Sequence, residues 1–180
     1  MKIYTRRGDS GLTDLFQGGR VQKDDSRPKA YGDIDETQAV IGLARSISEG
    51  DLEKILAEVQ RDLWILMAEL ACNPDRLDQL DERTGRCTPS MVGDLEKIID
   101  DISSRFESPT EFVVPGETEL AARLDFARTV CRRAERSSIS VVNDDSAVVP
   151  YLNRLSDLLW TLARWQEGSS RTTRSVGKST

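Results

Sequence analysis

The strongest fold signal in the chain is a run of aliphatic residues that recurs every three or four positions between residues 52 and 70. This spacing puts the aliphatic side chains on one face of an α-helix, which turns once in about 3.6 residues. An apolar helix face has to be buried against other elements, so the chain must supply partners of similar length. The run consists of Leu52, Ile55, Leu56, Val59, Leu63, Leu66 and Leu70.

Four other segments have the same helical periodicity. Their starts carry common helix signals, with Pro28 and Pro89 in first turns and Thr88 and Thr118 as candidate N-caps. No segment has the alternation of a convincing strand. The sequence therefore predicts an all-α fold, a bundle of five helices of roughly 19–25 residues each. The further helices are expected over about 28–48, 89–106, 118–142 and 147–167.

Non-helical segments flank and separate these helices. Residues 1–25 hold four glycines and little periodicity, so we expect an irregular segment that a ligand could order. Residues 73–88 are expected to be a loop, and residues 168–180 a disordered polar tail. A chain of 180 residues fits one domain, which we place over residues 1–167 with the helical bundle over 28–167.

The composition agrees with a helical bundle, since 31% of the residues are charged and only 6% are aromatic. The net charge of −6 argues against a nucleic-acid-binding surface. That charge is uneven: residues 1–29 have seven Lys or Arg against four Asp or Glu, whereas the other 151 residues have 18 against 27. A basic, glycine-containing start on an acidic body suggests a local anionic ligand.

The residue types that bind most protein metals are scarce. The chain has no histidine, which excludes a histidine general base, histidine-ligated zinc or haem, and the Glu-x-x-His pairs of di-iron bundles. Its three cysteines, Cys72, Cys87 and Cys131, are widely spaced and indicate neither a zinc site nor a disulfide framework. Reduced thiols in the cytoplasm are the simplest interpretation. Because no apolar run approaches about 18 residues and no signal-peptide pattern is present, we expect no membrane segment.

Three arginines form a candidate phosphate clamp on the helix expected over 118–142. Arg128, Arg132 and Arg136 are four residues apart and so share one ridge, and Glu135 lies three residues from Arg132, close enough to orient it. Guanidinium groups can bind two phosphate oxygens at once. The alternative is a solvated helix face that is rich in arginine.

The last expected helix and the first offer further polar candidates. On the last helix, Asn153 shares the face opposite the leucines with Asp157, Trp160 and Arg164, and it could bind a base or ribose edge or be an ordinary surface residue. On the first helix, Asp35 belongs to a cluster of acids in the early turns, which the helix dipole favours. The alternative there is a partner arginine from another helix or subunit.

Two loops complete the set of candidates. Near the start, glycines that let backbone N–H groups approach phosphate oxygens alternate with cationic and hydroxyl side chains. No Gly-Lys-Ser/Thr follows at the required spacing, so a Walker P-loop is excluded. Phe112, between two expected helices, either plugs the end of the bundle or presses against a large flat ligand. The N-terminal candidates are Thr5, Arg6, Gly8, Asp9, Ser10, Gly11 and Thr13, followed by Arg20, Lys23 and Arg27.

Together these segments resemble the ATP:corrinoid adenosyltransferases of the PduO type. The resemblance implies a five-helix bundle that assembles as a homotrimer with active sites between subunits. It also implies transfer of the 5′-deoxyadenosyl group of ATP to cob(I)alamin, with release of triphosphate. The stretches that carry it, over about residues 2–165, are KIYTRRGDSGLTDLF, GGRVQKDDSRPKAYGDIDETQAVIG, FVVPGETELAARLDFARTVCRRAERS and VPYLNRLSDLLWTLAR.

This chemistry needs no histidine, because the nucleophile is reduced cobalt and the protein supplies orientation and charge neutralisation. By the resemblance, Phe112 displaces the lower axial ligand of the corrinoid, which makes cobalt(II) easier to reduce. Asp35 pairs with Arg128 across the subunit interface, and Arg132 completes the catalytic set. The implied ATP site comprises Thr5, Arg6, Gly8, Asp9, Ser10, Gly11, Thr13, Lys23 and Arg27 of one subunit, and Arg132, Glu135, Arg136 and Asn153 of the next.

The resemblance also implies ligands and partners. Mg²⁺ is expected to arrive on the phosphates of ATP without dedicated protein ligands. Cob(II)alamin or cob(I)alamin is the other substrate, and a flavin reductase and a B12-dependent mutase or dehydratase are candidate partners. Two positions depart from the family, which commonly has glycine where this chain has Glu117 and histidine where it has Asp125. Both departures lie near the corrinoid side of the implied site.

Two other functions fit parts of the sequence. A binding protein could keep this fold and only deliver a corrinoid to a mutase, but the presence of Asp35, Phe112, Arg128 and Arg132 argues against lost chemistry. An all-α nucleotide pyrophosphatase would need several carboxylates at helical spacing around Mg²⁺, whereas the candidate phosphate stripe here is cationic.

Overall fold

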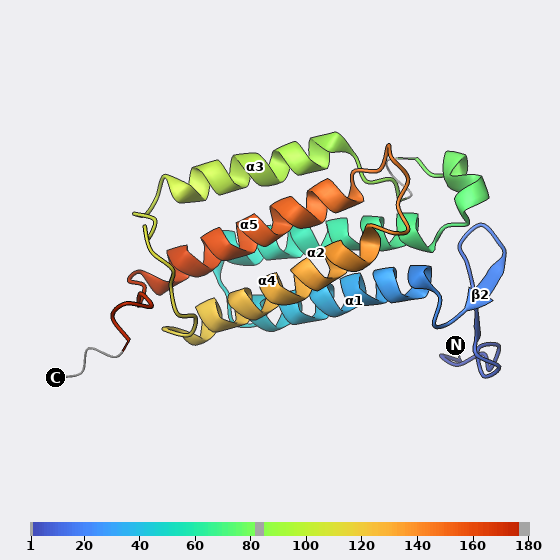
Figure 1. Cartoon of the computed structure of the whole chain (residues 1–180), viewed down its shortest axis with the longest axis horizontal. Helices are drawn as coiled ribbons and strands as arrows, with labels where there is room; N and C mark the ends of the chain where they lie inside the picture. Colours follow the sequence, from blue (N-terminus) through green and yellow to red (C-terminus); the bar gives the residue numbers. More distant parts are fainter. Residues whose placement is uncertain (1, 82–84, 177–180) are drawn as a thin grey trace.

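The computed structural model describes residues 2–81 and 85–176, which form a bundle of five α-helices. The helices run side by side along the long axis of the molecule, with the N-terminal segment at one end (Figure 1). The all-α five-helix bundle predicted from the sequence is confirmed. The helices are α1 Ser26–Arg45, α2 Gly50–Ala71, α3 Pro89–Ser103, α4 Glu119–Ser138 and α5 Val148–Glu167.

A short hairpin lies within the N-terminal segment, where no strand was predicted. Strands β1 Leu12–Asp14 and β2 Arg20–Gln22 pair antiparallel. The turn between them requires φ angles of +94° at Gly18 and +92° at Gly19, which glycine adopts readily. The prediction of a wholly irregular segment was wrong here, because strands of three residues are too short to show an alternating pattern.

Several predicted boundaries also differ from the structure, since α1 ends at Arg45 rather than 48 and α4 at Ser138 rather than 142. Helix α3 ends at Ser103, short of the predicted 106. The hydroxyl of Ser104 donates to the carbonyl of Asp101 at 2.7 Å, a local bond that competes with further helix. The loop predicted over 73–88 contains a short 3₁₀ helix, η1 Pro74–Gln79.

One hydrophobic core runs through all five helices. Helix α4 packs on α5 and α1, α1 also packs on α2, and α3 packs on α5. Every member of the aliphatic run on α2 is buried except Ile55, which is partly buried. Burial of one leucine side chain contributes about 1.5–3 kcal/mol, so this row is a main source of stability. Among the described residues, no helix is both long enough and apolar enough to span a bilayer.

Helices α1 and α4 run antiparallel, and an arginine side chain joins them near each end. Arg27, at the start of α1, donates from Nη2 to the carbonyl of Val141, just beyond α4, at 3.2 Å. Arg123, near the start of α4, donates to the carbonyl of Leu43, near the end of α1. The N-terminal segment therefore joins the bundle where α4 ends, and α4 begins at the opposite end (Figure 1).

Residues 168–176, called the C-terminal segment below, lie against the loop that contains Phe112. The N–H of Thr173 donates to the carbonyl of Phe112 at 2.9 Å, and the N–H of Val114 donates to the carbonyl of Arg171 at 2.8 Å. The expectation of a disordered tail was wrong for these residues, because backbone pairing with a distant loop is not visible in a run of small polar residues. Residues 177–180, the rest of that expected tail, lie outside the described residues.

Arg27 joins three parts of the bundle. Its Nη1 donates to the carbonyls of Leu70 and Cys72, at 3.1 and 3.5 Å, and its Nη2 donates to that of Val141. Carbonyl oxygens at helix ends have no N–H partner within the helix, and the guanidinium of Arg27 provides the missing donors. Both terminal nitrogens are occupied in this way, so a contribution of Arg27 to ATP binding stays a prediction.

We expect Arg27→Ala to lower the free energy of unfolding by about 1.5–3 kcal/mol, because three carbonyl oxygens lose a charged donor. Urea unfolding followed by circular dichroism measures this difference. Lys29→Ala, at an exposed position of the same helix, is the control and should change stability by less than about 0.5 kcal/mol. Equal stability of the two variants would contradict the role given to Arg27.

Candidate functional site

Residues 5–11 form a loop rich in turns before β1, and Thr13 lies within β1. The N–H of Gly11 donates to the carbonyl of Gly8 at 3.2 Å, and the N–H of Lys23 donates to the carbonyl of Gly11 at 2.8 Å. Lys23 is thereby brought over the loop: a Cβ atom on Gly8 would lie 2.9 Å from Lys23 Nζ, so a larger residue would displace the ammonium group. The structure thus gathers the predicted loop residues and Lys23 in one place.

Ion pairs close the hairpin beside this loop. Asp14 pairs with Arg7 and with Arg20, each at 3.0 Å, and Arg20 also donates to the carbonyl of Arg7 at 2.8 Å. These side chains are exposed, so each pair contributes at most about 1 kcal/mol. Arg6 and Lys23 form no ion pair within the described part of the chain. Their positive charges therefore remain available to an anionic ligand.

The arginine stripe predicted on α4 is present, but its members differ in environment. Arg132 and Arg136 are exposed, and neither pairs with a carboxylate among the residues that the structure describes. Glu135, predicted to orient Arg132, instead accepts a hydrogen bond from Nδ2 of Asn153 at 3.1 Å. This bond links α4 to α5 and holds the Asn153 amide beside the stripe.

The acids of α1 are held by an arginine that the sequence interpretation missed. Arg133 of α4 pairs with Glu36, and its Nε lies 3.5 Å from Asp33 Oδ1. The hydrogen bond with Glu36 raises the pKa of Arg133 above its ordinary value. These acids lie beyond the first turn, because α1 begins at Ser26, so the helix dipole does not explain them. Asp35, by contrast, is exposed and pairs with no cation in residues 2–81 or 85–176.

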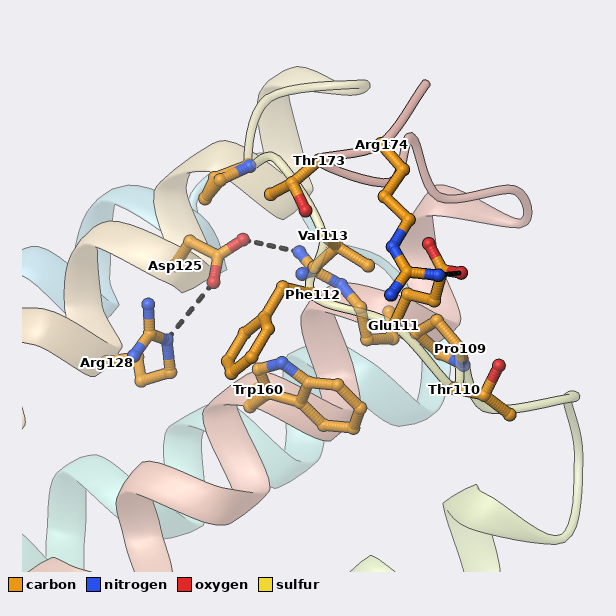
Figure 2. Close-up of a pocket in the computed structure, with 12 residues that line it drawn as sticks. Pro109, Thr110, Glu111, Phe112, Val113, Asp125, Arg128, Trp160, Thr173 and Arg174 are labelled. Atoms are coloured by element: carbon orange, nitrogen blue, oxygen red, sulfur yellow. Dashed lines mark hydrogen bonds and ion pairs between the residues drawn. The ribbon is translucent and has the colours of Figure 1, made fainter. Parts of the chain in front are cut away.

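A cavity of about 780 Å³ opens near the start of α4 and the end of α5. Figure 2 shows Phe112 beside it, close to Trp160 of α5 and Arg128 of α4. Phe112 is 86% exposed, so it does not plug the end of the bundle. Of the two interpretations of this residue, contact with a ligand is the one that its exposure favours.

Buried charges form part of the cavity wall. Arg164 was expected on a polar face of α5, but it is only 2% exposed and pairs with Asp125 and, at 3.0 Å, with Glu167. Asp125 also accepts a hydrogen bond from Nε of Arg128 at 3.2 Å. The place of Arg164 on the face opposite the leucines did not reveal this burial, because helical spacing shows where a side chain points but not which carboxylate meets it.

The N-terminal loop and the loop that contains Phe112 lie at opposite ends of the bundle (Figure 1). Phe112 lines the cavity, so within one chain the cavity lies far from the N-terminal loop. Helix α4 has 20 residues, which corresponds to a length of about 30 Å. Arg136 lies eight residues beyond Arg128 on this helix, about 12 Å farther along its axis. A single chain therefore brings Arg128 to Phe112 but keeps both far from the predicted ATP loop.

The cysteine thiols are free and buried. Burial raises the pKa of Cys87 and Cys131 far above the usual thiol value, and it also raises the pKa of Cys72. The thiols therefore stay protonated near neutral pH, a state in which they are poor nucleophiles. Among the described residues, no group of three or more Cys, Asp or Glu side chains is placed to hold a metal ion.

A family model and several known proteins that match this chain are described as cobalamin or corrinoid adenosyltransferases. The model of a family described as cobalamin adenosyltransferase matches residues 3–166. The corrinoid adenosyltransferase of Citrobacter freundii is 38% identical over 92% of this chain and 95% of that protein. The corrinoid adenosyltransferase PduO of Salmonella typhimurium is 38% identical over 94% of this chain, which spans about half of that protein, 51%. A solved variant of the PduO-type ATP:corrinoid adenosyltransferase from Lactobacillus reuteri, complexed with cobalamin and ATP, has a TM-score of 0.85 and 29% identity, over 96% of this chain and 97% of that one.

The raised pKa values predict slow thiol chemistry in the folded protein. At a pH just below the ordinary thiol pKa, Cys72, Cys87 and Cys131 should react with Ellman's reagent far more slowly than in denaturant, because burial disfavours the thiolate and blocks access. The release of the coloured product measures the rate. Rapid reaction of any thiol in the native protein would contradict this description.

Proposed function

The chain belongs to the cobalamin adenosyltransferase family, and we propose that it transfers the 5′-deoxyadenosyl group of ATP to cob(I)alamin. In this reaction the cobalt(I) of the substrate attacks the 5′-carbon of ATP. A cobalt–carbon bond forms, the bond from that carbon to oxygen breaks, and triphosphate leaves with the bonding electrons. Cobalt is formally oxidised to cobalt(III), and the products are adenosylcobalamin and triphosphate.

The observation that carries this proposal is the exposed Phe112 beside the cavity. An aromatic ring that is 86% exposed is available to lie against a flat ligand such as a corrin ring. The cavity of about 780 Å³ has the size of a small-molecule site. We assign to Phe112 the displacement of the lower axial ligand of cobalt, which leaves a four-coordinate cobalt(II) that is easier to reduce.

The N-terminal loop and the arginine stripe supply the ATP side of the proposed site. Arg132 and Arg136 are exposed and have no carboxylate partner among the described residues. Arg6 and Lys23 likewise form no ion pair there. Donors fixed around the triphosphate neutralise the charge that grows there as the bond to the 5′-carbon breaks. Asn153, held by Glu135, is assigned to the base or ribose edge. The remaining assigned loop residues are Thr5, Gly8, Asp9, Ser10, Gly11 and Thr13.

We further propose that the site forms between the subunits of a homotrimer. The loop and the cavity lie at opposite ends of one chain, so the loop of one subunit would meet the stripe and cavity of the next. Asp35 is exposed without a cation partner in the described part of the chain. In the described part of the chain, Arg128 forms a hydrogen bond only through its Nε. These two observations support an ion pair between Asp35 and Arg128 across the interface.

The remaining proposals concern the metal, the location and the partners. Mg²⁺ enters on the phosphates of ATP, because it keeps phosphate and water ligands readily. A cytoplasmic location fits the three free thiols, which persist in reducing compartments. A flavin reductase would supply the electron that cobalt(II) needs, and a B12-dependent mutase or dehydratase would receive the product.

The activity is tested by mixing the protein with MgATP and chemically reduced cobalamin. The absorbance of cob(I)alamin should be replaced by that of adenosylcobalamin, with release of an equimolar amount of triphosphate. Heat-denatured protein is the control for spontaneous alkylation. Binding of cobalamin without conversion would indicate a carrier and would refute the proposed activity.

The role of Phe112 is tested by Phe112→Ala. Turnover that starts from cob(II)alamin should fall at least about tenfold, or about 1.4 kcal/mol of barrier, because the lower axial ligand is no longer displaced. The KM for ATP should be unchanged, since Phe112 is not assigned to the nucleotide. Trp64→Ala, which alters another exposed aromatic on α2, is the control. An equal effect of Phe112→Ala on turnover and on ATP binding would contradict the assignment.

A further inference from the structure

Asp125 holds two arginines at once, one through each carboxylate oxygen. Its Oδ1 accepts from Nε of Arg128 at 3.2 Å (Figure 2), and its Oδ2 pairs with Nη2 of Arg164. Asp125 is only 4% exposed, so both contacts lie in a region of low dielectric, where charges interact more strongly than at the surface. Within the described residues, Asp125 is the one carboxylate that pairs with Arg128.

The charges behind Asp125 explain why it holds a second arginine. Arg164 shares its Nη2 between Asp125 and Glu167, and the side chains of all three are almost completely buried. One buried cation therefore faces two buried carboxylates, and an unbalanced buried charge is costly. Arg128, whose side chain is 26% exposed, supplies the second positive charge and balances the cluster.

Arg128 is held in a way that leaves its terminal nitrogens available. Its Nε bonds to Asp125, and its Nη1 and Nη2 form no hydrogen bond with residues 2–81 or 85–176. A guanidinium has five N–H donors in a planar fork, so it can serve a second acceptor along its outer edge. Arg128 and Phe112 both line the cavity. The direction of the outer edge of the guanidinium therefore decides where the cavity presents N–H donors to a second copy of the chain.

The same buried cluster reaches the loop that contains Phe112. Glu167 accepts a hydrogen bond from the hydroxyl of Ser170, in the C-terminal segment, at 2.7 Å. That segment in turn hydrogen-bonds to the carbonyl of Phe112. Glu117 pairs with Arg171 of the segment at 3.0 Å. Both positions where this chain departs from the family pattern therefore connect to the C-terminal segment, one directly and one through the buried cluster.

We propose that Asp125 is a positioning residue for the adenosyl transfer. It fixes Arg128 through Nε, so that the two terminal nitrogens face the carboxylate of Asp35 in a second copy of the chain. The proposal rests on the proposed function and trimer. A neutral histidine, common in the family at this position, has a single acceptor nitrogen and cannot hold two arginines from opposite sides. The aspartate of this chain does so with its two oxygens.

The first test compares two variants that remove the same charge from the same cluster. Asp125→Asn should lower kcat for alkylation of cob(I)alamin about 10- to 100-fold, because a misplaced arginine slows the reaction. The KM for ATP should be unchanged, since the ATP contacts remain. Glu167→Gln is the matched control: it also removes one buried carboxylate but keeps the bond between Asp125 and Arg128, so it should keep the wild-type kcat.

A double-mutant cycle with Arg128→Ala separates positioning from stability. If Asp125 acts through Arg128, adding Asp125→Asn to Arg128→Ala lowers kcat no further, whereas independent effects multiply. Multiplying effects, or equal losses of kcat in Asp125→Asn and Glu167→Gln, would overturn the proposal. If Asp125→Asn does not fold by circular dichroism, the variant that combines it with Arg164→Gln and Glu167→Gln replaces it in the cycle, because this triple change leaves no buried charge unpaired.

Oligomer mass, measured by light scattering after size exclusion, makes the test independent of catalysis. Asp125→Asn and Arg128→Ala should weaken the trimer equally on dilution, and Glu167→Gln should not. A monomeric wild-type protein overturns the proposal. If the wild type alkylates cobalamin and Asp125→Asn matches it in rate and mass, only the positioning role fails. If the wild type does not alkylate but the masses shift as expected, the proposed activity fails and the placing of Arg128 by Asp125 stands.

Discussion

The antiparallel packing of α1 on α4 determines where each part of the proposed site can lie. Arg27 ties the start of α1 to Val141 beyond α4, and Arg123 ties the start of α4 to Leu43 near the end of α1. These two contacts and the apolar core between the helices prevent one helix from sliding along the other. The N-terminal loop is thereby kept about one helix length, roughly 30 Å, from the cavity. In the proposed trimer, each chain contributes two half-sites, each completed by a neighbouring chain.

The sequence predicted the parts of this structure that depend on local spacing. Helical periodicity located all five helices, and Thr118 caps α4 as expected, accepting from the N–H of Ala121 at 3.1 Å. The missed features depend on contacts between distant positions: Arg164 meets Asp125 across 39 residues, and the C-terminal segment pairs with the Phe112 loop through backbone bonds and two ion pairs. Of the candidate site, the sequence identified the loop, the stripe and Phe112. It did not reveal that the N-terminal loop and Phe112 lie at opposite ends of one chain, because periodicity carries no information on how helices are ordered in space.

Several arginines of the molecule fall into two groups with different tasks. Arg7, Arg20, Arg133 and Arg164 each face carboxylates of their own chain, and they hold the hairpin, join α1 to α4 or balance the buried cluster. Arg6, Arg132 and Arg136 have no such partner among the described residues and are exposed. Arg128 belongs to both groups, since one side of its guanidinium is paired and the other is not. The sequence alone does not separate these groups, because membership depends on whether a carboxylate of the same chain lies against the guanidinium in the fold.

The backbone pairing of the C-terminal segment has a consequence for how this part of the chain can vary. Two of the bonds that join it to the Phe112 loop are made by peptide groups, which are the same for nearly every residue type. Arg171 and Arg174 add ion pairs to Glu117 and Glu111 of that loop. Side chains other than those of Ser170, Arg171 and Arg174 can therefore be exchanged while the path of the segment beside the cavity stays the same. Proline in place of Thr173 is the exception, because it removes the N–H that Phe112 accepts. A constant path with exchangeable side chains lets the end of the chain diversify what the cavity admits while the bundle stays unchanged.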